Sequence, residues 1–442
     1  MTTSAVAGRP ARSLRPMVGV LGAMAVSQTG TKVSAVALPW FVLATTGSAT
    51  MTGLAAFVEM TPYVVSMALT GPLVDRLGPR VVSWTTDAVS AAAALLIPVL
   101  HGQGLLPFWA LMVLVAVIGL MRGPGDLAKS VMVPEAADHA EVPLERATGL
   151  AGVTERLAGT IGPAVGGGLV ALVGPMAGLV LNAATFALGS LVVAVLLPGG
   201  TGRAAVPERA GEGGGSEGYW PMLRAGFGFL RSEPLMLAVI VMVGITNLLD
   251  IGFITVLLPV WAQESGQGPA AIGLTGAVMG VTAVVGSLIA AAVAHRMPRR
   301  TVFLLGFLVC GAPRFLVLAS GAPMWVVLAV FAVAGFGSGF LNPILGAIFF
   351  ERVPRHLLGR VHALSDSLAW AGIPLGGLLA GAAVAGTGLI PALVAGGVLY
   401  FATTTLAGLR PEWREMDRLR GKGAASAGRA EREAAAGATA GS

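Results

Sequence analysis

Long apolar runs fill most of this 442-residue chain and constrain its fold more than any other feature. A helix of about 20 apolar residues crosses the roughly 30 Å hydrocarbon core of a bilayer. Only 11% of the residues are charged, against about 25% in soluble domains, so lipid has to replace water around the chain. We count twelve such runs, at 17–44, 50–73, 81–100, 105–122, 147–171, 176–197, 235–260, 270–294, 301–319, 323–348, 361–385 and 388–408. The sequence therefore predicts an all-α polytopic membrane protein.

The 28 lysine and arginine residues are distributed unevenly among the predicted loops. Lys32, Arg156 and Arg314 fall within predicted spans, and the others lie in the two tails, at one end of the spans or in alternate loops. The intervening loops, near residues 46–49, 101–104, 172–175, 261–269, 320–322 and 386–387, contain neither lysine nor arginine. Cytoplasmic loops carry the excess of these residues. We therefore predict a multi-pass plasma-membrane protein with both termini in the cytoplasm, and we explain the net charge of +6 by topology rather than by nucleic-acid binding.

A polar segment divides the twelve spans into two groups of six. Residues 198–221 are rich in glycine, glutamate and arginine and have no apolar periodicity, which is typical of a flexible linker. We predict a tail at 1–16, a six-helix half at 17–197, a cytoplasmic linker at 198–234, a second six-helix half at 235–408 and a largely disordered tail at 409–442. Residues 412–420 are a candidate surface helix within that tail.

The two halves repeat short sequence elements at matching places. The segment 71–80 (GPLVDRLGPR) follows span two, and 291–300 (AAVAHRMPRR) follows span eight. Span five carries 162–167 (GPAVGG), and span eleven carries 372–377 (GIPLGG). Duplicated six-helix units are typical of transporters that bind their substrate between the halves near the middle of the membrane.

These elements resemble the major facilitator superfamily over nearly all of residues 15–410, and the resemblance implies two pseudo-symmetric six-helix halves. Residues 122–126 and 367–374 resemble its drug:proton antiporter branch, which contains macrolide efflux permeases and the enterobactin exporter. The loop after span two resembles the superfamily's signature loop at Gly71, Asp75, Arg76, Gly78 and Arg80. Span five resembles the antiporter motif of its exporters at Gly149, Ala158, Gly162, Pro163, Gly166 and Gly167, with Ala158 in place of a usual glycine.

The signature loop predicts a latch on the cytoplasmic side. Arg76 and Arg80 can pair with carboxylates, and Asp126 after span four is the expected partner. Asp75 can accept hydrogen bonds at a neighbouring helix N-terminus. Ordinary cytoplasmic placement of basic residues is the alternative explanation. The Gly-Pro element of span five predicts a flat, small helix face for tight packing, either against the other half or within a generic helix interface.

Charged residues inside spans are costly in lipid and are therefore functional candidates. Lys32 lies in span one, Glu59 in span two, and Asp250 in span seven near Asn247. The resemblance implies that helices one, four, seven and ten line the substrate cavity, which favours Lys32 and Asp250, with Glu59 beside them. A carboxylic acid in a low-dielectric site can bind and release protons near neutral pH. A lysine–acid pair that only neutralises itself is the alternative. Structural ion pairs are predicted for Asp87, Glu155, Arg156 and Asp366, and Arg314 is also expected to be structural.

The leading functional hypothesis is efflux of a small amphipathic compound, such as a drug or a macrolide-like or siderophore-like metabolite, in exchange for protons. We expect a monomer that works by alternating access in the lipid bilayer, without enzyme activity, cofactor or metal. Residues 166–168 are not a phosphate loop because Lys-Ser/Thr does not follow them. The five histidines show no metal-ligand spacing, and the single cysteine excludes an internal disulfide. An importer or facilitator of a polar solute and a non-transporting membrane sensor remain alternatives.

Overall fold

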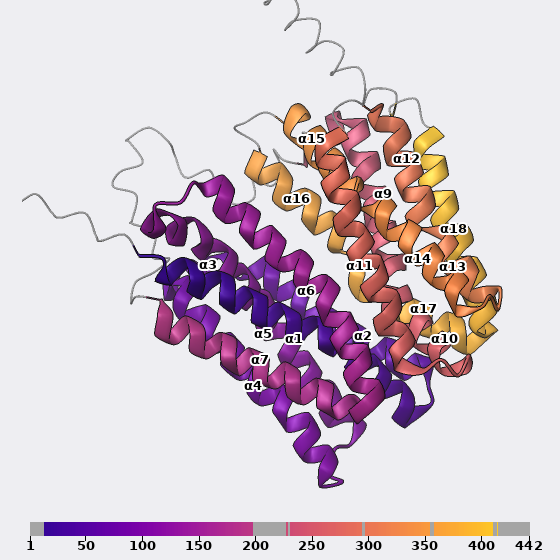
Figure 1. Cartoon of the computed structure of the whole chain (residues 1–442), viewed down its shortest axis with the longest axis horizontal. Helices are drawn as coiled ribbons and strands as arrows, with labels where there is room; N and C mark the ends of the chain where they lie inside the picture. The colour runs from indigo at the N-terminus through magenta and orange to yellow at the C-terminus, as the bar shows by residue number, and fades with distance from the viewer. Residues whose placement is uncertain are drawn as a thin grey trace, which may run out of the picture. The chain divides into compact units, whose positions relative to one another are not determined.

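The computed structural model describes residues 13–197, 227–228, 230–293, 297–353, 358–409 and 413. Over these residues the chain is helical and contains no strand (Figure 1). The predictions for the first 12 residues, for most of the linker, and for all of the C-terminal tail and its surface helix at 412–420 except residues 409 and 413 concern residues outside the described part of the chain.

Eleven helices of the described chain are long and apolar enough to cross a membrane. Each of them overlaps a span predicted from the sequence. The remaining predicted span, 17–44, is also a helix, but the polar run from Ser27 to Lys32 in its middle makes it less apolar than the others. The helices therefore confirm the predicted all-α polytopic fold.

The helices of the first 197 residues follow one another through short turns. Gly174 separates two of them with φ 103°, a conformation that suits glycine, and Pro175 begins the next helix. Ser48 caps another helix by accepting a hydrogen bond from the Met51 N–H. The elements are α1 (Arg15–Thr46), α2 (Ala49–Leu69), α3 (Gly71–Leu77), α4 (Pro79–Gly102), α5 (Phe108–Ala140), α6 (Leu144–Val173) and α7 (Pro175–Leu196).

Several spans of the second half consist of more than one helical piece. Span seven contains a π-helical turn, and span nine is interrupted at Gly311. The elements are α9 (Pro234–Gly252), the π-helix η1 (Phe253–Leu257), α10 (Leu258–Glu264), α11 (Gly268–Val293), α12 (Arg299–Cys310), α13 (Ala312–Ala319), α14 (Met324–Ser338), α15 (Leu341–Arg352), α16 (Leu358–Trp370), α17 (Ile373–Thr387) and α18 (Leu389–Leu409).

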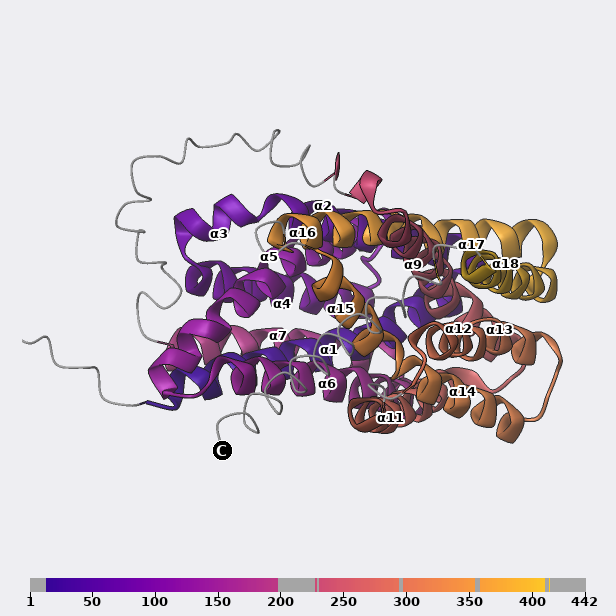
Figure 2. The ribbon, with the colours of Figure 1, turned by 90° about the horizontal axis from the view of Figure 1, so that it is seen from above.

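The chain divides into two compact units whose boundaries differ from those of the two groups of six spans. Unit 1 comprises Met1–Gly214, Gly252–Ala277 and Pro374–Gly386, and unit 2 comprises Gly215–Ile251, Val278–Ile373 and Thr387–Ser442. In unit 1, α1 lies alongside α6 and α7 in both ribbon views (Figures 1 and 2). In unit 2, α13 packs against α18. Parts of spans seven, eight and eleven thus belong to the same unit as the first six spans.

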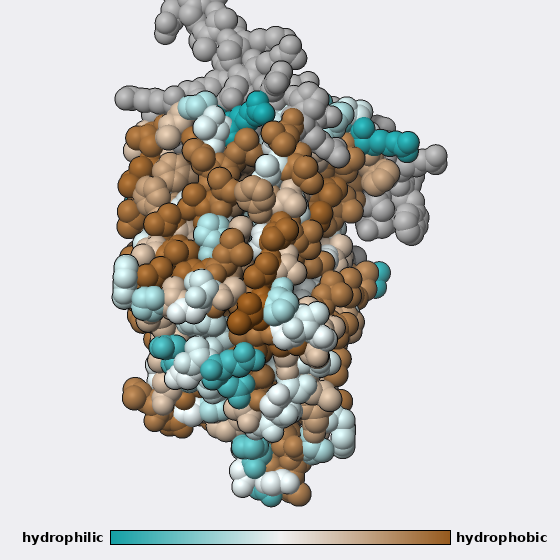
Figure 3. Space-filling model, turned by 90° about the vertical axis from the view of Figure 1, so that its right-hand side faces the viewer, coloured by the Kyte–Doolittle hydropathy of each residue, from teal (hydrophilic) through white to brown (hydrophobic). Residues whose placement is uncertain are grey.

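Apolar side chains make up both the interior and much of the outer surface. In unit 1, Phe41, Ile97 and Phe186 belong to one buried cluster. The face shown in Figure 3 is largely hydrophobic. Large apolar side chains such as Trp109 and Trp325 are exposed. A surface of this kind is expected of a protein whose spans face lipid.

Helix α5 corrects the predicted end of span four. The prediction ended this span at residue 122 and placed the following residues in a loop, but the helix continues to Ala140 through Pro124 and Pro134. Gly123 and Gly125 are buried, and a Cβ atom on Gly125 would lie 2.9 Å from Thr86 Oγ1 of α4. These glycines therefore serve close helix packing rather than helix termination.

Candidate functional site in the membrane-spanning helices

A group of charged side chains surrounds Arg122 on α5 of unit 1. Arg122 Nη1 lies 3.1 Å from Glu59 Oε1 on α2, and Arg122 Nε lies 3.8 Å from Asp126 Oδ2 one turn further along α5. The guanidinium carbon lies 4.1 Å from the ring centroid of Tyr63. One largely buried guanidinium therefore serves two carboxylates and an aromatic face.

Lys32 belongs to the same group through electrostatics rather than through a direct ion pair. It lies exposed on α1, and its charge interacts with Arg122, Asp126 and Glu155. We call Lys32, Glu59, Arg122, Asp126 and Glu155 the α5 charge cluster. It contains three carboxylates and two cations, and so it carries one unneutralised negative charge when all five groups are ionised.

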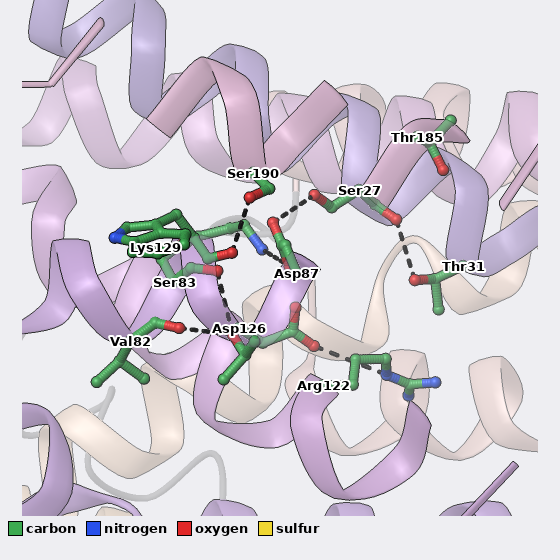
Figure 4. Close-up of polar contacts among 12 residues, drawn as sticks. Ser27, Thr31, Val82, Ser83, Asp87, Arg122, Asp126, Lys129, Thr185 and Ser190 are labelled. Atoms are coloured by element: carbon green, nitrogen blue, oxygen red, sulfur yellow. Dashed lines mark hydrogen bonds and ion pairs between the residues drawn. The ribbon is translucent and has the colours of Figure 1, made fainter. Parts of the chain in front are cut away.

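A second charged group in unit 1 is a buried ion pair. Lys129 Nζ of α5 donates to Asp87 Oδ1 of α4 over 2.8 Å, and both side chains are at most 4% exposed. Ser27 of α1 donates to the other carboxylate oxygen, Asp87 Oδ2, over 3.2 Å (Figure 4). The sequence predicts an ion pair for Asp87, and the structure supplies Lys129 as its partner.

Unit 2 holds an ion pair between α9 and α13. Arg314 Nη2 donates to Asp250 Oδ1 over 2.7 Å. The Arg314 side chain is 4% exposed, whereas that of Asp250 is 32% exposed. Asn247, one turn before Asp250, donates from Nδ2 to the Ala369 carbonyl over 3.1 Å. Asp250 and Asn247, which the sequence selected, thus lie together, and Arg314 joins them as the neutralising cation.

Span nine and the last helix fit together beside Arg314. Gly311 separates α12 from α13, and the Tyr400 ring of α18 occupies the space into which a Cβ atom on Gly311 would project. Tyr400 is buried, and its ring centroid lies 6.1 Å from that of Phe315. The break in span nine is therefore filled by an aromatic side chain, which fixes the position of α13.

Arg80 of the signature loop contacts a backbone carbonyl rather than a carboxylate. Gly71, Asp75 and Arg76 lie on α3, where Arg76 is exposed, and Gly78 ends that helix with φ 85°. Arg80 donates from Nη2 to the Ala194 carbonyl over 2.6 Å.

Arg80 and Asp126 each contact another group in this structure, and the latch between the loop arginines and Asp126 stays a prediction. Ala194 lies in the last turn of α7, where carbonyl groups lack partners within the helix, and this explains why it attracts Arg80. Asp126 instead contacts Arg122 within α5.

The antiporter-motif residues lie on one continuous helix, α6, with Pro163 inside it. A Cβ atom on Gly166 would lie 3.0 Å from the Val33 carbonyl oxygen of α1, and one on Gly167 would lie 2.6 Å from the Gly273 nitrogen of α11. A Cβ atom on Gly162 would likewise meet the Lys32 side chain of α1. Within unit 1 the motif therefore brings α6 close to the backbones of α1 and α11. Of the other two motif positions, Gly149 faces open space and Ala158 is buried.

The fold defines the class of this protein, and comparison with known sequences identifies its family. The fold and the embedded charges are those of a polytopic membrane transporter. Two overlapping segments, residues 20–265 and 240–434, match the sequence model of the Major Facilitator Superfamily, and the chain belongs to that family.

Similar relatives and structures extend over nearly the whole chain. The Multidrug efflux pump Tap of Mycobacterium tuberculosis is 31% identical over 406 residues, which cover 91% of this chain and 95% of the relative. Tap of Mycolicibacterium fortuitum is 28% identical over 409 residues, covering 91% and 97%.

Two crystal structures share the fold. The nucleoside transporter NupG has a TM-score of 0.71 at 14% identity, with 89% of this chain and 98% of that chain covered. A bacterial homolog of the human lysosomal transporter Spinster has a TM-score of 0.61 at 13% identity, covering 91% and 97%. At these identities the likeness concerns the fold alone.

Proposed function

We propose that the protein exports small amphipathic compounds across the plasma membrane in exchange for protons. It would do so as a monomer, by alternating access, with both termini in the cytoplasm. The similarity to Tap over 91% of the chain supports export of drug-like compounds. The antiporter motif on α6, from Gly149 to Gly167, supports exchange rather than uptake.

The observation that carries the proton-coupling proposal is the negative excess in the α5 charge cluster. Protonation of Glu59 or Asp126 would leave Arg122 with the other carboxylate, so this guanidinium would keep a counter-charge. Protonation of Asp87 or Asp250 would instead break the ion pair that each makes with a buried cation, Lys129 or Arg314, which is unfavourable. We therefore assign the exchangeable proton to the Glu59–Arg122–Asp126 part of the cluster.

The hydrogen bonds that polar side chains of α1 and α9 make within the protein favour an amphipathic substrate over a sugar-like one. Thr29 and Thr31 on α1 donate to the carbonyl groups of Ala25 and Ser27, over 2.7 and 3.0 Å. Asn247 donates to a backbone carbonyl of α16. Because these donors are already used within the protein, few remain for a densely hydroxylated solute, whereas apolar contact and one charge interaction suffice for a drug-like compound.

Transport by purified protein in liposomes tests the proposal. Vesicles containing inside-out and right-side-out protein would be loaded with a fluorescent amphipathic dye, and release would be measured with and without an imposed pH gradient. We expect the gradient to accelerate release by the wild type but not by Glu59→Gln or Asp126→Asn. Glu264→Gln, which alters an exposed acid at the end of α10, is the matched control and should behave as the wild type.

The same vesicles distinguish the other functions. Equal release with and without the gradient would contradict proton coupling. Gradient-driven accumulation of a polar solute in the direction of the proton flux would indicate an importer, and absence of any solute flux would indicate a non-transporting protein. Labelling of single cysteines placed in the two tails, from either side of intact cells, tests the proposed orientation.

A further inference from the structure

Three charged residues follow one face of α5. Arg122, Asp126 and Lys129 are separated by four and three residues, spacings that bring side chains together on a helix. Arg122 and Asp126 belong to the α5 charge cluster, whereas Lys129 is directed to Asp87 on α4 (Figure 4). Two neighbouring cations on α5 therefore have different counter-ions, although Asp126 lies between them in sequence.

The Asp87 carboxylate occupies a closely fitted place between helices. A Cβ atom on Gly125 of α5 would lie 3.5 Å from Asp87 Oδ1, and one on Gly189 of α7 would lie 3.0 Å from Asp87 Oδ2. Lys129 occupies one carboxylate oxygen and Ser27 the other. The two glycines and the two donors fix the position and orientation of this carboxylate.

Lys129 depends on Asp87 for its position. Within the described part of the chain, Asp87 Oδ1 is the acceptor that lies within hydrogen-bonding distance of Lys129 Nζ. An ammonium group this deeply buried requires a negative partner. If Asp87 lost its charge, Asp126, three residues before Lys129 on the same helix, would be the nearest carboxylate available on α5.

We propose that Asp87 is a positioning residue for proton coupling, because it holds Lys129 on the α4 side and prevents Lys129 from neutralising Asp126. The inference rests on the proposed function. Among the described residues, Arg122 contacts Asp126 directly, and Lys32 of α1, Tyr63 of α2 and Asp87 of α4 interact with it electrostatically. Transfer of Lys129 into the α5 charge cluster would give it three cations and three carboxylates, so the negative excess that accepts the proton would disappear.

The test compares charge variants of the buried pair in the liposome assay. The measured quantity is the ratio of gradient-driven to downhill dye release, because a purely structural defect lowers both rates together. We expect Asp87→Asn to reduce this ratio to about one while downhill release continues. Lys129→Gln breaks the same ion pair but removes the competing cation, and it should keep the wild-type ratio. The double variant D87N/K129Q should restore the ratio, and Asp87→Glu should preserve it.

The outcomes separate this inference from the proposed function. If the pH gradient does not accelerate dye release by the wild type, proton coupling and this inference are both overturned. If the gradient accelerates release by the wild type, but Asp87→Asn and Lys129→Gln have equal ratios of gradient-driven to downhill release, the inference alone is overturned. Lys129→Gln contains no unpaired cation but leaves the buried Asp87 carboxylate without Lys129, whereas the double variant contains neither charge of the pair. The double variant therefore remains measurable if a single variant fails to fold. Loss of coupling in Lys129→Gln or in the double variant would contradict the role assigned to Asp87.

Discussion

Replacement of Asp250 by Asn should destabilise the protein more than replacement of its partner, Arg314, by Met. The reason is that the two members of this ion pair are unequally buried. The Arg314 side chain is 4% exposed and that of Asp250 is 32% exposed. Asp250→Asn removes the carboxylate to which the buried Arg314 guanidinium donates, and breaking a buried ion pair in this way costs about 3–5 kcal/mol. Arg314→Met leaves a carboxylate that water can partly reach or that can take up a proton, so we expect roughly 1–3 kcal/mol.

Thermal unfolding of the purified protein in detergent measures this difference. At about 2–4 °C per kcal/mol for a unit of this size, Asp250→Asn should lower the midpoint by about 6–20 °C. The double variant D250N/R314M should be more stable than Asp250→Asn, since no unpaired charge remains. Glu264→Gln controls for loss of an exposed acid. A midpoint for Asp250→Asn equal to that of the wild type, or above that of Arg314→Met, would refute the reasoning.

Three further substitutions test packing described above. Gly167→Val should cost about 1–3 kcal/mol and slow transport, because its side chain would meet the α11 backbone, whereas Gly149→Ala faces open space and should leave dye release unchanged. Gly311→Ala should also lower the unfolding midpoint, and normal stability would mean that Tyr400 does not fill the break in span nine. Ser48→Ala should cost about 1 kcal/mol by removing the α2 cap, and an unchanged midpoint would contradict that assignment.

The span pattern was predictable because its cause is local. Each crossing requires its own apolar run of sufficient length, and the turn at Gly174-Pro175 follows from the conformational preferences of those two residues. The charged and glycine-rich segment after Arg122 was misread for the opposite reason. The partners that allow charges inside α5 are Glu59 and Asp87, which are distant in the sequence.

The candidate site was predictable only in part. Lys32, Glu59 and Asp250 were selected because charge inside a span requires an explanation. The sequence does not identify Arg122 and Lys129 as site residues, since Arg122 is the last residue of the predicted span 105–122 and Lys129 lies beyond it. Their spacing with Asp126 on one helical face was a signal that could have placed all three inside α5. The Arg80 contact with Ala194 could not be predicted, because any exposed helix end offers carbonyl groups.

The fit between span nine and the last helix has a consequence for biosynthesis. Gly311 and Arg314 leave the ribosome well before Tyr400, the residue whose ring fills the break in span nine. Until the final span has been inserted, α13 lacks the surface that fixes its position, so the ion pair between Arg314 and Asp250 should be completed late in assembly. A nascent chain that ends before α18 would therefore lack the aromatic ring that fills the break in span nine.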